Sequence, residues 1–91
     1  MKTIWKFQSL VRDEIYVSGP APLNVIHVES DGASRLTIWA EVDSAGDPSQ
    51  LTRMLFVVGT GHPIPVEAGE HLASVVAPPF VWHVYNGGLL K

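Results

Sequence analysis

The segment Gly59-Thr60-Gly61-His62-Pro63 has the clearest potential for chemistry. Two glycines around a threonine, placed after an apolar run, let the backbone approach a ligand closely. Their N–H groups would form a small anion-binding concavity, and Thr60 and His62 would add side-chain hydrogen bonds. The Lys-Ser/Thr pair and the helix of a phosphate-binding P-loop are absent. The alternative is a sharp turn, in which glycines serve backbone angles and prolines add stiffness.

Aromatic and basic side chains form a second set with ligand-binding potential. A tryptophan that stacks on a base and an arginine that holds a phosphate are common partners of nucleotides. Arg35 and Trp39 alternate with apolar residues, so both are expected on the solvent or interface side of a strand. The alternative role of a tryptophan is an anchor in a core or an interface. The predicted ligand-binding residues are Arg35, Trp39, Arg53, Gly59, Thr60, Gly61 and His62.

Four histidines are the remaining reactive side chains, since the chain has no cysteine. No two of them have the spacing that places both rings on one metal ion, so we predict no metal site and no cofactor. The serines and Asp43 are not spaced to assemble a catalytic triad, so we predict no enzyme and no catalytic residues. An enzyme with His62 or His83 as the acid–base group is the last-ranked alternative.

Alternating polarity and turn residues divide the chain into short strands. An Asp31-Gly32 hairpin is expected between two of them, and the apolar run 55–58 predicts a central strand buried on both faces. After Asn86 we expect a free tail. The sequence therefore predicts one all-β domain over residues 1–91, a small sandwich or barrel of six to seven mostly antiparallel strands with little or no helix. The expected strands are 3–8, 13–17, 23–29, 35–42, 51–58, 71–77 and 80–85.

Composition limits the location and partners of this 91-residue chain. Charged residues make up 16% of it, against about 25% in typical proteins, and 46% is hydrophobic. So small a domain has too little interior for this apolar material, so we expect surface patches that form a homo-oligomer. The net charge of −3 argues against nucleic acid as a partner. We expect a cytoplasmic protein, because the sequence shows no signal peptide and no apolar run of membrane-spanning length.

Four stretches carry a resemblance that extends over most of the chain: Ile4-Trp5-Lys6-Phe7, the pattern 36–43, the segment 59–65 and Val81-Trp82-His83-Val84. Together they resemble a family of short phage and prophage proteins of unknown function. The resemblance implies a phage or prophage origin and a small soluble β domain. It supplies no catalytic residues.

A phage origin favours a role against host defence. Small phage accessory proteins of this kind include oligomers whose interfacial pockets sequester nucleotide signals, and this chain is similar to them in size and apolar surplus. We therefore expect a non-enzymatic, homo-oligomeric protein that sequesters a small nucleotide-like host immune signal in the host cytoplasm. The alternative is a structural or protein-interaction module without a small ligand, such as a virion component or an inhibitor of a host protein.

Overall fold

The structure is a computed structural model that describes residues 1–32 and 34–90. These residues form seven strands and no helix, so the all-β prediction is confirmed. It follows that no helix long and apolar enough to cross a membrane lies among them. The strands are β1 (Lys2–Leu10), β2 (Glu14–Gly19), β3 (Pro22–Ser30), β4 (Arg35–Asp43), β5 (Leu51–Gly59), β6 (His71–Ala77) and β7 (Phe80–Leu90).

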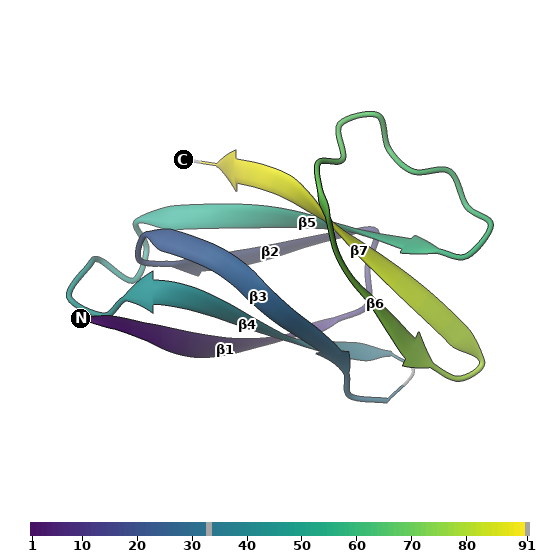
Figure 1. The fold of residues 1–91 in the computed structure, drawn as a ribbon, viewed down its shortest axis with the longest axis horizontal. Coiled ribbons are helices and arrows are strands. Elements are labelled where there is room, and N and C mark those ends of the chain that lie inside the picture. Colours follow the sequence, from purple (N-terminus) through teal and green to yellow (C-terminus); the bar gives the residue numbers. More distant parts are fainter. Residues whose placement is uncertain (33, 91) are drawn as a thin grey trace.

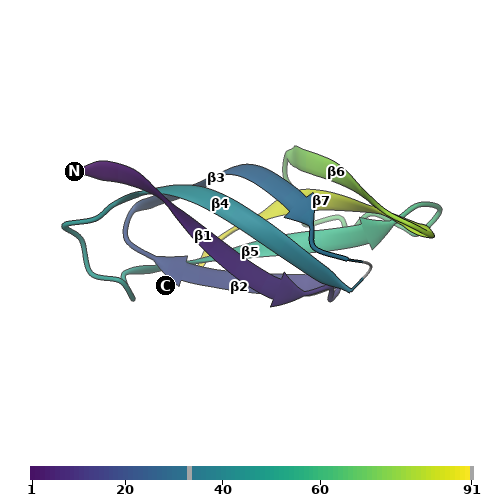
Figure 2. The same ribbon diagram turned by 90° about the horizontal axis from the view of Figure 1, so that it is seen from below.

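The strands form the two layers of a sandwich (Figure 2). Sheet A has the order β1-β4-β3, sheet B has the order β2-β5-β7-β6, and every ladder is antiparallel. In both ribbon views the β6–β7 hairpin extends past the end of sheet A (Figure 1). The two sheets therefore overlap along most of their length, but one end of sheet B continues alone.

The core follows from the alternation of β4. Leu36, Ile38, Ala40 and Val42 point inward and are fully buried, whereas Trp39 lies on the outer face, as the alternation predicts. The inward residues form two neighbouring clusters with apolar side chains of both sheets. Burying a side chain of leucine size contributes about 1.5–3 kcal/mol, so this strand is a main source of stability.

The expected hairpin joins β3 to β4, with Gly32 at a φ of +82°. A positive φ is the conformation for which glycine is chosen in such turns. β6 and β7 form a second hairpin, in which Ser74 pairs with His83 and Val75 with Trp82. Its turn contains a cis Pro78-Pro79 bond.

The expected tail after Asn86 is wrong. β7 continues to Leu90, and its last residues pair with Thr52 and Arg53 of β5. The ladder shifts register at Gly87, where an added Cβ would lie 2.9 Å from the carbonyl oxygen of Met54. The glycine is thus the extra residue of a β-bulge, which the sequence alone does not distinguish from the end of a strand.

Candidate functional site

A pocket of about 680 Å³ opens where β5 runs past the beginning of β2. β2 starts at Glu14, which pairs with Phe56, so the last residues of β5 have no β2 partner. The pocket has a volume within the range of small-molecule sites. Its lining consists of the β1–β2 connection, the end of β5, the segment that follows β5 and one side chain of β7: Val11, Arg12, Asp13, Glu14, Met54, Phe56, Val57, Val58, Gly59, His62, Pro63, Pro65, Glu67 and Trp82.

Aromatic and apolar side chains form one part of the pocket. Phe56 lies on the outer face of sheet B and is nonetheless only 6% exposed, and Trp82 stacks on Phe80 with ring centroids 5.0 Å apart. The indole Nε1 of Trp82 is buried and has no hydrogen-bond partner among the described residues. A buried donor without a partner is costly.

Charged side chains form the other part. Asp13, Glu14 and Glu67 supply three carboxylates against the single guanidinium of Arg12, which leaves a formal balance of −2 with His62 neutral. Glu14 also accepts a hydrogen bond of 2.7 Å from the hydroxyl of Tyr16, and this contact raises the pKa of Tyr16 above its ordinary value. This balance disfavours a ligand with several negative charges.

The Gly59–His62 segment is a tight turn at the wall of the pocket. The N–H of His62 donates to the carbonyl of Gly59 over 3.0 Å, and Gly61 has a φ of +89°. Gly59 and His62 line the pocket, whereas Thr60 is bonded to His83. The segment thus forms a turn that needs glycine at Gly61, and two of its residues form part of the wall of the pocket.

A chain of hydrogen bonds crosses the outer face of sheet B. His83 contacts Thr60 Oγ1 through Nε2 at 2.9 Å and Ser74 Oγ through Nδ1 at 2.7 Å, and Ser74 Oγ also lies 2.8 Å from Nε2 of His71. Such a chain can pass a proton between hydroxyls and imidazoles. These four residues do not line the pocket at the end of β5.

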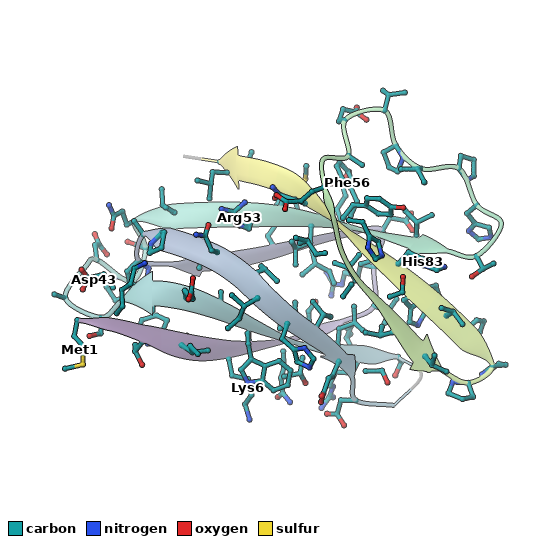
Figure 3. All side chains as sticks on the ribbon, viewed as in Figure 1. Met1, Lys6, Asp43, Arg53, Phe56 and His83 are labelled. Carbon is teal, nitrogen blue, oxygen red and sulfur yellow. The ribbon has the colours of Figure 1, made fainter. Side chains whose placement is uncertain are left out.

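Arg53 lies inside the protein, between β5 and the beginning of β3 (Figure 3). It is 8% exposed and donates to the carbonyl of Leu23 at 2.6 Å and to Oδ1 of Asn86 at 2.8 Å. Burial lowers the pKa of Arg53, and the negative charge of Glu70 acts in the opposite direction. The residue reaches a separate pocket of about 260 Å³ and is apart from the Gly59–His62 turn.

Arg35 and Trp39 lie at a third place, the outer face of sheet A. Trp39 is opposite Lys6 on one side and His27 on the other, and its ring lies 5.2 Å from the imidazole. Arg35 is exposed at the start of the same strand. The structure therefore does not bring the seven predicted residues together: two line the large pocket, Thr60 and Gly61 complete the turn, and the other three lie elsewhere.

A model of the family described as Domain of unknown function (DUF7352) matches residues 1–89. The chain belongs to this family. The expected resemblance to a family without known function is thus confirmed at that level. No curated protein matches the chain, and no solved structure matches it.

Every lining residue of the large pocket falls within the DUF7352 match. Sequence reasoning missed the carboxylates, Arg12, Phe56 and Trp82 as parts of this site. Arg12 is 42 positions from Met54, and they meet only because β2 pairs with β5. The available signal was the charged cluster Arg12-Asp13-Glu14 directly before a strand, which has no local partner in the sequence.

Proposed function

We propose that this DUF7352 protein is a non-enzymatic phage accessory protein that binds and sequesters a small nucleotide-like signal of host immunity in the pocket at the end of β5. The observation that carries the proposal is the pocket itself. Apolar, aromatic and proline side chains together with four charged side chains line a volume of about 680 Å³, which is within the range of small-molecule sites. Sequestration requires binding without chemistry.

The charge balance of the pocket narrows the ligand class. A flat base would pack on the aromatic and proline side chains, and the unpartnered Nε1 of Trp82 would donate to a base or sugar oxygen once the ligand displaces the groups that cover it. Arg12 provides the one permanent positive charge of the lining. The pocket therefore fits a nucleoside or a nucleotide with one phosphate better than a ligand with several phosphates.

Calorimetry and thermal unfolding of the purified protein with adenosine, AMP, ATP, ADP-ribose and a cyclic dinucleotide test this function. We expect binding and a higher Tm with the first two, because a ligand at about a thousand times its Kd adds about 4 kcal/mol to stability. Arg12→Ala should weaken the binding of AMP more than the binding of adenosine, and Arg35→Ala should change neither affinity. No binding by any of the five compounds, or binding that is lost in Arg35→Ala and retained in Arg12→Ala, would refute the proposed site.

The second candidate is a protein-interaction module. The segment after β5 presents Ile64 at 53% and Val66 at 96% exposure, the latter almost free of contacts with its own chain. Apolar side chains in this position are typical of a contact surface for another protein. A stable complex with a host protein that is lost in Ile64→Ser/Val66→Ser, while adenosine and AMP do not bind, would favour this candidate over the first.

A further inference from the structure

The free edge of β1 is the least protected edge in the sandwich. β1 has nine residues, contains neither proline nor glycine, and pairs with β4 without a register shift. It is an edge strand of sheet A, paired on one side with β4, and it borders the lower left of the molecule in Figure 1. A long regular edge of this kind presents unpaired N–H and C=O groups that another strand can bind.

The other edges carry protection that β1 lacks. β3 begins at Pro22 and has two register shifts, and Ser30 Oγ on this strand donates to the carbonyl of Val76 on β6 at 3.1 Å. Edges β3 and β6 therefore cover each other. β2 has six residues and ends at Gly19, directly before Pro20. Short length, proline and bulges are devices that block pairing between sheets.

The hydrogen bonds show which groups of β1 face outward. Met1 O accepts from Ser44, and Val11 N–H donates to Ser34, so the odd-numbered residues direct their backbone groups toward β4. In an antiparallel ladder these directions alternate, so the even-numbered residues direct theirs to the free edge. These residues are Lys2, Ile4, Lys6, Gln8 and Leu10.

We propose that β1 pairs with β1 of a second copy, antiparallel about a two-fold axis at Phe7, and that this joins two copies of sheet A into one six-stranded sheet. In this register Ile4 lies opposite Leu10 of the second copy, and Lys6 lies opposite Gln8. Ile4 and Leu10 are 53% and 49% exposed in one copy, so the pairing covers apolar surface. It also forms hydrogen-bonded pairs of outward-directed residues along the strand.

Neighbouring registers are less favourable. An axis at Lys6 would place Lys6 opposite Lys6, and like charges directly opposite each other destabilise a sheet. An axis at Trp5 would pair Lys6 with Ile4 and leave Leu10 without a partner strand. One outward carbonyl, that of Leu10, already accepts from Ser9 Oγ at 2.8 Å, but a carbonyl has a second lone pair for the partner's N–H.

Cysteine cross-linking tests the register, since the chain has no cysteine of its own. Lys6 and Gln8 are exposed, and Figure 3 shows Lys6 projecting from the border of the molecule. Hydrogen-bonded antiparallel partners have Cα atoms about 5.5 Å apart, which suits a disulfide. An equimolar mixture of Lys6→Cys and Gln8→Cys should form a disulfide-linked dimer, whereas either variant alone should not. Equal cross-linking of Lys6→Cys alone would overturn this register.

Sedimentation equilibrium of the native chain tests the dimer itself, with a mass of twice 9.9 kDa expected. Lys6→Pro removes an outward N–H from each copy and leaves the ladder with β4 intact. We expect its dimer Kd to rise about thirtyfold, the effect of two lost hydrogen bonds. Tyr16→Pro, which removes an outward N–H from the edge of β2, is the matched control and should leave the Kd unchanged.

A charge pair provides a third test that does not depend on proline. Ile4→Lys/Leu10→Lys places like charges opposite each other across the axis and should dissociate the dimer. Ile4→Lys/Leu10→Glu places opposite charges there and should restore it. A native chain that sediments at 9.9 kDa at 100 µM would overturn the proposal, and this result would leave ligand binding by the pocket untouched.

Discussion

The two ends of β5 show how the same strand serves structure at one end and exposes a candidate site at the other. Near its beginning, β5 has β2 on one side and β7 on the other, and Arg53 is enclosed with its donors on protein oxygens. Near its end, the β2 partner is missing, and Gly59 and His62 form part of the wall of an open pocket. The comparison teaches that Arg53, where both neighbouring strands are present, is held by protein oxygens, whereas the end of β5 that lacks β2 is open to the pocket of about 680 Å³.

The largest expected effect is at the enclosed end. Arg53→Ala leaves the carbonyl of Leu23 without its side-chain donor, removes one of the two donors to Oδ1 of Asn86 and opens a cavity, so we expect a loss of about 3 kcal/mol in the free energy of unfolding. Urea denaturation measures it. Arg35→Ala, an exposed arginine, is the control and should stay within about 0.5 kcal/mol of the native chain. A stable Arg53→Ala variant that no longer binds ligand would reverse the assignment of the two ends.

Two glycines provide a smaller contrast of the same kind. Gly87→Ala should cost about 2 kcal/mol, because the new Cβ would meet the backbone oxygen of Met54 at 2.9 Å. In Gly61→Ala the new Cβ would meet nothing within 4 Å. This variant should lose about 1 kcal/mol in the free energy of unfolding, because alanine disfavours the φ of +89° at this position.

Asparagine separates the two causes. Because asparagine tolerates a positive φ, Gly61→Asn should recover part of the loss, whereas Gly87→Asn should not. Thermal unfolding of the four variants measures whether crowding or backbone conformation causes each loss of stability. Equal losses in Gly61→Ala and Gly61→Asn would show that space rather than backbone conformation limits the turn.

A substitution of Trp82 tests the end of β5 that borders the pocket, with little change in the free energy of unfolding. Trp82→Phe removes the unpartnered Nε1 but keeps an aromatic ring beside Phe80, so we expect stability within about 1 kcal/mol of the native chain. If Nε1 binds the ligand, the affinity for adenosine or AMP should fall about tenfold, the effect of one hydrogen bond. Calorimetry measures it, and an unchanged affinity would remove Trp82 from the site.

The smallest effect concerns the loop that leads into β5. Hydrogen bonds from the backbone N–H and the hydroxyl of Ser49 hold the pKa of Asp47 below its ordinary value of 3.8. A lowered pKa in the folded state adds stability above pH 3.8, and this contribution is lost as the pH falls through the folded pKa. The difference in Tm between the native chain and Asp47→Ala should therefore shrink between about pH 5 and pH 2. A constant difference across this range would contradict the role of the charge.

Local patterns explain how far the fold could be predicted. Alternation placed the core face of β4 correctly, and Asp31-Gly32 marked the hairpin between β3 and β4, because side-chain period and turn conformation depend on neighbours in the sequence. The bulge at Gly87 escaped, since its meaning depends on Met54 on another strand. Arg53 was assigned to a ligand for the same reason: Leu23 and Asn86, which hold it, are 30 and 33 positions away.

The amino-acid sequence by itself determined the all-β class, the approximate positions of the seven strands and the inner and outer faces of β4, because these depend on interactions over a few residues. Only the tertiary structure decided which polar residues are enclosed and which line a pocket. That outcome depends on where β2 begins along β5, and a ladder between distant segments sets its register through side-chain packing rather than through any local signal.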